Sequence, residues 1–174
     1  MKIILAYSLI TMTTCLVTPT CSATVKDTVV FAIFTGTTPC SNVIRPLHKI
    51  REEPDCNMME CLCVMVEWKL TLYQDPVTGE LTNYTLSSTN RFIVKETNMY
   101  SQPGTKAESE GKCTIVRGSK TNPLAILYRL NPDQPAISVD FLKLSDHLLH
   151  ILDHDGKLMI GNEFWSYTLN RVSN

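Results

Sequence analysis

The sequence predicts an all-β protein, built as one antiparallel barrel or sandwich. Apolar and polar residues alternate with a period of two along most of the chain, which is the pattern of strands with one dry face. Clusters of Gly, Pro, Asn and Asp interrupt these runs about every 8 to 12 residues, as in proteins made of short strands. About nine or ten strands are expected from this spacing.

Residues 62–73 are the clearest predicted strand, because the even-numbered positions are all apolar and the odd-numbered positions are of mixed character. The next segment, 75–79, contains Pro76 and Gly79 and is expected to be a turn, since Pro fixes φ and Gly accepts a positive φ. Residues 81–87 then return as the second strand of a hairpin. The other predicted strands are 29–34, 91–96, 112–117, 124–130, 137–142, 147–152, 157–160 and 165–171.

A second hairpin and two loops complete the predicted elements. Asp155-Gly156, between two apolar runs, is the strongest short hairpin signal in the chain. Residues 39–54 are rich in basic side chains and begin and end with Pro, which predicts a long loop. Residues 98–110 are polar and contain Pro-Gly, which predicts a mobile loop. No linker divides the chain, so residues 24–174 are expected to form a single β-barrel domain.

The first 23 residues are typical of a cleaved secretory signal peptide. A basic start precedes the uncharged apolar run 3–17, and small residues lead to Ala23, after which cleavage is expected. The run is shorter than the roughly 20 residues that a membrane-spanning helix needs. We therefore predict export to the periplasm, to an outer-membrane-associated site or to the cell exterior. Lipidation of Cys15 or Cys21 is the alternative, and membrane attachment would require it.

Composition and motifs exclude several classes of function. The 174-residue chain has 16 basic and 17 acidic side chains and a formal net charge of −1, which argues against a nucleic-acid partner. It lacks a Gly-x-Ser-x-Gly, a phosphate-binding glycine loop and a His-Glu-x-x-His, and its carboxylates are scattered. These observations predict a non-enzymatic protein whose partner is a small ligand or an envelope protein.

Five cysteines remain after the predicted cleavage, and an oxidising compartment favours disulfides among them. A bond from Cys40 to Cys56, Cys61 or Cys63 would pin the long loop and stabilise the fold by roughly 3 kcal/mol in the chain-entropy model. Alternatively, Cys56, Cys61, Cys63 and Met65 provide the soft sulfur ligands that Cu(I) prefers, so copper(I) is the one cofactor considered. The disulfide candidates are Cys40, Cys56, Cys61, Cys63 and Cys113.

Two further motifs have a functional and a structural interpretation. His147, His150 and His154 would share one face of a helix and could hold zinc, whereas on a strand His147 points away from the other two. The Asp-Gly turn favours the strand, and with it the structural interpretation. Asn83-Tyr84-Thr85 matches the N-glycosylation sequon, which has meaning only in a eukaryotic source.

Aromatic residues are spaced to face the inside of the barrel. They could pack as a solid core, as in most barrels of about eight strands, or line a ligand cavity. The candidates for the cavity are Trp68, Tyr128, Phe141, Trp165 and Tyr167.

Several short motifs together resemble the N-terminal domain of NlpE, a family of envelope-stress and copper-homeostasis lipoproteins. Residues 34–40 (Phe-Thr-Gly-Thr-Thr-Pro-Cys) resemble its opening, 148–157 its Asp-Gly hairpin, and 165–171 its final strand. Glu110-Gly111-Lys112 and the segment 126–130 follow in the same order. The resemblance implies a small lipocalin-like antiparallel barrel preceded by a cleaved signal peptide. Where the family has Cys-x-x-Cys, this chain has Cys40 followed by Ser-Asn-Val.

Three functions follow from these patterns. The first is an exported module that binds a small ligand or senses the state of the envelope. The second is a copper(I)-responsive protein that uses the sulfur cluster at 56–65. The third is an interaction protein in which the barrel is a scaffold and residues 39–56 form the contact surface.

Overall fold

The protein, described here from a computed structural model, is a closed antiparallel β-barrel of eight strands. The structure describes residues 27–40, 61–94, 99–100, 104–119 and 122–172. A ninth, two-residue strand, β4, pairs with the end of β3 and stays outside the ring. The strands are β1 (Val29–Pro39), β2 (Cys61–Gln74), β3 (Leu81–Val94), β4 (Met99–Tyr100), β5 (Thr105–Arg117), β6 (Ile126–Leu130), β7 (Val139–Ser145), β8 (Leu148–Ile151) and β9 (Thr168–Val172).

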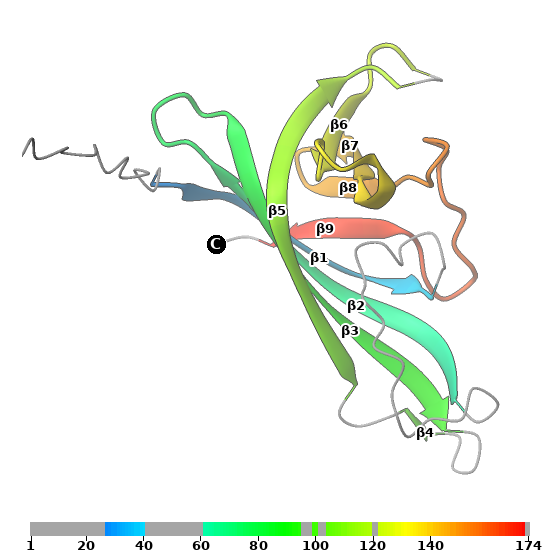
Figure 1. Ribbon diagram of the computed structural model, residues 1–174. Coiled ribbons are helices and arrows are strands. Elements are labelled where there is room, and N and C mark those ends of the chain that lie inside the picture. Colours follow the sequence, from blue (N-terminus) through cyan, green and yellow to red (C-terminus); the bar gives the residue numbers. More distant parts are fainter. Residues whose placement is uncertain (1–26, 41–60, 95–98, 101–103, 120–121, 173–174) are drawn as a thin grey trace, which may run out of the picture.

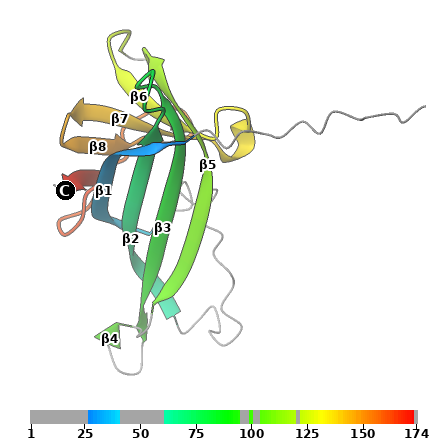
Figure 2. The same ribbon diagram turned by 90° about the vertical axis from the view of Figure 1, so that its left-hand side faces the viewer.

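The ring is built from a long-stranded half and a short-stranded half. Strands β1, β2, β3 and β5 have 11 to 14 residues each and lie side by side as one curved sheet (Figures 1 and 2). Strands β6 to β9 have four to seven residues and connect β5 back to β1. The long strands therefore extend beyond the part of the barrel that the short strands complete.

Side chains fill the inside of the ring. One continuous apolar core contains residues of β2 and β3 together with residues of the other strands; from β2 and β3 its members are Val66, Trp68, Leu70, Leu72, Leu81, Tyr84 and Leu86. The indole N–H of Trp68 is satisfied within this core, since its Nε1 donates to Oγ1 of Thr38 at 2.9 Å. The largest fully buried apolar side chains are Tyr84, Phe34, Phe141, Leu70, Leu72, Leu86, Leu130, Leu149, Ile151 and Leu169.

Both predicted hairpin turns are present. Oδ1 of Asp75 accepts hydrogen bonds from the backbone N–H groups of Val77 (2.8 Å) and Thr78 (3.1 Å), which closes the β2–β3 turn. In the second turn Gly156 has a φ of 77° and Leu152 forms a bridge with Leu158. The alternation and the turn chemistry thus located these elements correctly.

Several predicted boundaries are wrong, and β1 runs to Pro39 where a strand over 29–34 is predicted. Residues 98–110, expected to be a loop, contain β4 and half of β5, because each residue from 105 to 112 pairs with β3 despite its polarity. Residues 81–87 and 91–94 belong to one continuous strand, β3, and residues 95 and 96 of the second predicted strand lie outside the described residues. Residues 157–160 form a single bridge instead of a strand, and 165–167 precede β9. At residues 98–110 and within β3, tertiary pairing overrides the local polarity that suggested a loop or a break.

Candidate functional site

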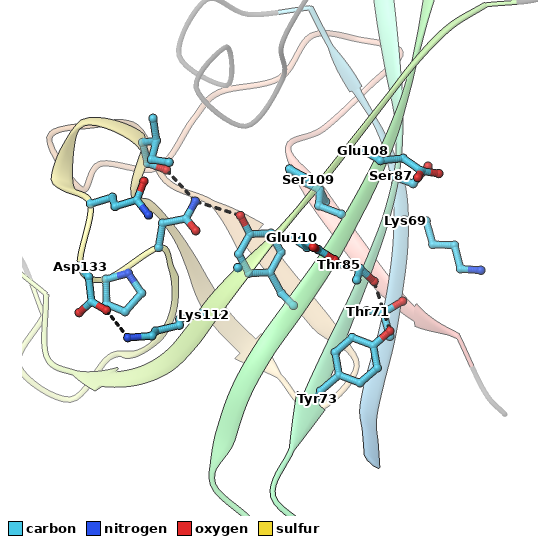
Figure 3. Close-up of a pocket in the computed structure, with 17 residues that line it drawn as sticks. Lys69, Thr71, Tyr73, Thr85, Ser87, Glu108, Ser109, Glu110, Lys112 and Asp133 are labelled. Carbon is cyan, nitrogen blue, oxygen red and sulfur yellow. Dashed lines mark hydrogen bonds and ion pairs between the residues drawn. The ribbon is translucent and has the colours of Figure 1, made fainter. Parts of the chain in front are cut away.

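A groove of about 1060 Å³ lies beside β5, between the long strands and the turn that follows β6 (Figure 3). In Figure 3 the labelled side chains lie on both sides of the β5 ribbon, with Lys112 and Asp133 on one side and Lys69 and Glu108 on the other. The groove is lined by Lys69, Thr71, Tyr73, Tyr84, Thr85, Leu86, Ser87, Glu108, Ser109, Glu110, Gly111, Lys112, Asn131, Pro132, Asp133, Gln134 and Ile137.

The outer floor of the groove consists of cross-strand rows of polar side chains. Thr71 on β2 is opposite Thr85 on β3, which is opposite Glu110 on β5. One row further along, Lys69 is opposite Ser87, which is opposite Glu108. The side chains of both rows lie on the face of the sheet that points away from the core. Hydroxyl and charged groups therefore form this outer face of the groove.

The groove exists because β5 changes partners halfway along its length. Residues 105–112 pair with β3, and residues 113–117 pair with β6. Beside residues 105–111, the part of the chain that the structure describes contains no strand on the side where β6 would continue. The barrel therefore has a gap along one edge of β5.

The chain after β6 leaves the sheet at Asn131, and this ends β6 opposite the middle of β5. Asn131 has a φ of 52°, a left-handed conformation that suits Asn, and Pro132 follows it. Its Nδ2 donates to Oη of Tyr84 at 2.9 Å and to the carbonyl of Ile137 at 3.3 Å. A Cβ on Gly111 would collide with Oδ1 of Asn131, so the turn and β5 fit together only with glycine there.

At the groove, one lysine forms an ion pair, whereas two glutamates form none with the described side chains. Nζ of Lys112 lies 2.6 Å from Oδ2 of Asp133, and this bond raises the pKa of Lys112. Glu108 and Glu110 are exposed and form no ion pair with any side chain that the structure describes. The edge of β5 thus presents, on one face, two carboxylates that have no ion-pair partner among the described side chains.

The opposite face of this half of β5 is formed by small residues, Ala107, Ser109 and Gly111. Oγ of Ser109 is buried and has no hydrogen-bond partner among the described residues. Small side chains at this edge leave space for side chains of an added strand on the inner side.

Four of the five aromatic candidates for a ligand cavity are packed in the core. Trp68, Tyr128, Phe141 and Tyr167 are buried and belong to the same apolar cluster. Burial raises the pKa of Tyr128. Trp165 is half-buried and contacts Phe164, with ring centroids 5.7 Å apart, outside that cluster. The interior thus has the packed arrangement of a small barrel.

Of the five cysteines of the predicted mature chain, the structure describes the side chains of Cys40 and Cys113. Cys113 is a free thiol buried in the core, and burial raises its pKa to about 12. Cys40 is disulfide-bonded, and its partner sulfur lies outside the described side chains. Cys56 and the side chains of Cys61 and Cys63 also lie outside them.

The copper(I) cluster therefore stays a prediction. Met65, its fourth member, lies on β2 opposite Pro39 and is half-buried. The contact loop predicted at 39–56 lies outside the described residues except for Pro39 and Cys40, and so do Cys15 and Cys21.

The three histidines do not converge. His150 lies on β8, with Nδ1 3.2 Å from Oγ1 of Thr168 and Nε2 3.0 Å from the carbonyl of Met159, whereas His154 is exposed in the hairpin turn and His147 lies in the turn before β8. Desolvation lowers the pKa of His150. Within the described residues no group of three potential metal-ligating side chains is present. Asn83 of the sequon is exposed on β3, opposite Lys112.

No protein-family model, curated protein or solved structure matches the chain. The likeness to NlpE therefore consists of the short motifs described above together with a small antiparallel barrel. No helix in the described residues has the length and apolar character needed to span a membrane.

The groove is not predicted from the sequence, because the polarity of residues 98–110 indicates a loop. One signal was available: Lys106, Glu108, Glu110 and Lys112 alternate with small residues. Charge at every second position is also the pattern of a protected edge strand.

Proposed function

We propose that this protein is a non-enzymatic binding protein of an exported compartment, and that it binds its ligand outside the barrel, in the groove beside β5. The observation that carries the proposal is the contrast between the packed apolar core and the large open groove at the edge of β5. A pocket with converging polar groups is the usual place for a ligand, and this one has about 1060 Å³.

The shape and chemistry of the groove favour an elongated polar ligand. Its floor follows the strands and alternates hydroxyl groups with charges, as in the rows that end at Glu108 and Glu110. Tyr73 adds an aromatic ring whose hydroxyl lies 3.4 Å from Oγ1 of Thr85. An extended polypeptide segment has both the length and the hydrogen-bonding groups to fit such a surface.

The exported location rests on the predicted signal peptide, and a sensing role in the envelope rests on the resemblance to NlpE. Both agree with a barrel that serves as a rigid scaffold for an external site. The absence of catalytic motifs in the sequence supports a binding role without chemistry.

A selection experiment tests the proposed function. Random peptides displayed on phage would be selected on the exported, processed protein and then measured against two variants. Thr85→Trp places an indole in the centre of the groove, whereas Val77→Trp places the same side chain in an exposed turn outside it. We expect selected peptides to lose binding to Thr85→Trp and to retain it on Val77→Trp. Peptides that bind all three proteins equally, or a selection that enriches no sequence, would contradict the proposal.

A further inference from the structure

The edge of β5 that faces the groove carries main-chain hydrogen-bonding groups that can be located from one contact. The backbone N–H of Asn131 donates to the carbonyl of Lys112 at 2.9 Å, so the main chain of Lys112 points away from β3. In an antiparallel ladder the N–H and C=O of a residue point to the same neighbour, and this direction alternates along the strand. The main-chain groups of Lys106, Glu108 and Glu110 therefore also point away from β3, into the gap.

No described segment fills that gap. β6, which pairs with β5 over residues 113–117, stops at Leu130 because the chain turns away at Asn131. The space in line with β6 is bounded at one end by the turn 131–137, which itself lines the groove. Residues 105–111 leave room for a strand of about seven residues, which continues the line of β6 and so runs antiparallel to β5.

The side chains beside the gap define the chemistry of such a strand. On the outer face, Glu108 and Glu110 form no ion pair within the described residues, and Lys106 precedes them at the same spacing. Directly opposite residues in an antiparallel pair contact each other, and opposite charges there are favourable. Basic residues at two alternate positions would match the two glutamates, and an acidic residue would match Lys106.

We propose that the groove binds an extended peptide segment that has Lys or Arg at two alternate positions, and that this segment adds to the barrel as a strand antiparallel to β5. This inference rests on the proposed function and specifies its ligand. Main-chain hydrogen bonds to Lys106, Glu108 and Glu110 would supply affinity, and the cross-strand charges would supply specificity. The small residues Ala107 and Ser109 would accommodate apolar side chains of the ligand on the inner face.

A second copy of the chain fits this edge less well than a basic peptide does. In an antiparallel pair of two β5 strands, the register with Glu108 opposite Glu110 also places Lys106 opposite Lys112, so all of these pairs are repulsive. The register with Glu108 opposite Glu108 keeps that one repulsive pair beside two Lys106–Glu110 pairs, whereas a basic peptide in its register has no repulsive pair. Charged edges also resist unselective pairing, so the alternating charges would admit one ligand class and exclude apolar strands.

Amide hydrogen exchange of the free protein tests the geometry. The amides of Ala107, Ser109 and Gly111 face β3 and should exchange slowly, whereas those of Lys106, Glu108 and Glu110 should exchange fast. Equal protection of both sets would show that the edge is already occupied, and would overturn the proposal. Protection of Lys106, Glu108 and Glu110 that grows with protein concentration would assign the edge to a second copy instead.

A synthetic peptide tests the ligand. Acetyl-Thr-Lys-Val-Lys-Val-Glu-Thr-amide places its two Lys opposite Glu110 and Glu108 and its Glu opposite Lys106. We expect it to slow exchange of the three edge amides and leave the amides facing β3 unchanged. The charge-reversed peptide (Glu for Lys, Lys for Glu) should bind about tenfold or more weakly, since three favourable pairs become repulsive. The same basic peptide N-methylated at its Lys and Glu amides should not bind.

A charge exchange on the protein is the matched control. The double variant Glu108→Lys with Glu110→Lys should bind the charge-reversed peptide at least as tightly as the basic one, with an unchanged urea midpoint, because both side chains are exposed. If both peptides bind both proteins equally, the charge assignment is wrong.

The remaining outcomes separate this inference from the proposed function. If groove-dependent peptides emerge from the selection but do not slow exchange at Lys106, Glu108 and Glu110, strand addition is excluded while binding in the groove stands. If neither synthetic peptide binds and the selection also enriches nothing, both proposals fail.

Discussion

The two halves of β5 belong to one strand but have opposite environments. Residues 113–117 pair with β6, place Cys113 in the core, and pack Val116 against a second small apolar cluster of Ala125, Leu127 and Leu152. Residues 105–111 pair with β3, have charges on one face and small residues on the other, and lie beside the groove. Residues 113–117 contribute to stability through packing, whereas residues 105–111 have no strand beside them on the β6 side among the described residues and form the edge that we propose as the binding site.

This difference shows how a closed barrel can still offer a binding edge. Closure normally removes strand edges, which would otherwise pair with other chains. Here β5 pairs with β3 through one half and with β6 through the other, so the ring closes while residues 105–111 have no second strand partner among the described residues. The four predictions below test this division, in order of expected effect.

The largest effect is expected beside the packed half. Leu130 is fully buried and lies opposite Cys113, so Leu130→Ala should lower the free energy of unfolding by about 3 kcal/mol, through lost burial and a cavity. Ser109→Ala, in the groove half, should change it little or raise it, because the buried hydroxyl has no partner within the described residues. Urea titration of both variants measures the contrast, and similar losses would remove the distinction.

The junction between the halves should show an intermediate effect. Gly111→Ala would force a Cβ against Oδ1 of Asn131, and we expect a loss of about 1 to 3 kcal/mol. Asn131→Gly keeps the left-handed backbone and removes that oxygen. In a double-mutant cycle, Gly111→Ala should therefore cost less in the Asn131→Gly background than in the native protein. Strictly additive effects would show that the contact with Asn131 is not the cause.

A pH dependence should appear in the short-stranded half. His150 is half-buried beneath Met159, and desolvation lowers its pKa below the ordinary value of 6.5. Because the unfolded chain then binds the proton more readily, stability should be complete above pH 6.5 and should fall as the pH is lowered below it. Thermal unfolding between pH 7.5 and 5 measures this, and the same pH series on His150→Gln should show a shallower fall. Parallel curves for the two proteins would assign the pH dependence to other groups.

The smallest effect is expected at the open edge. Glu110→Gln removes an exposed charge that has no ion-pair partner within the described residues. The free energy of unfolding, measured by urea titration, should therefore change by less than about 0.5 kcal/mol. Thr114→Gln, on the same face of the packed half and half-buried, is the comparison. A larger loss at Glu110 than at Thr114 would mean that the edge contributes to the fold.

Much of the fold could be predicted from the sequence. The alternation at residues 62–73 gave the inner face of β2, since Val66, Trp68, Leu70 and Leu72 are all buried. Asp75 and Gly156 marked both hairpin turns, because their local hydrogen bonds and backbone angles depend on residues close in sequence. The alternation also places Trp68, Tyr128, Phe141 and Tyr167 on the inside of the barrel. It does not decide whether these side chains fill the interior or line a cavity.

The candidate site could not be predicted in the same way. Residues 105–110 look like a loop because they lack apolar side chains, and only pairing with β3 makes them a strand. The disulfide partner of Cys40 could likewise not be chosen from the sequence, because pairing depends on distances between cysteines across the fold. The groove depends on where β6 ends relative to β5. β6 ends before the left-handed Asn131, which packs against Gly111, 20 positions earlier in the sequence.

The sequence by itself determined the all-β class, the antiparallel hairpins and the residues of the core, because period, turn chemistry and hydrophobicity act between near neighbours. Tertiary structure decided that the ring closes, that β5 changes partners, and that its charged half has a strand on only one side among the described residues. Strand pairing joins residues that are far apart in the chain. Because the backbone hydrogen-bonding groups are the same in nearly every residue, the local sequence does not specify which strand will be the partner.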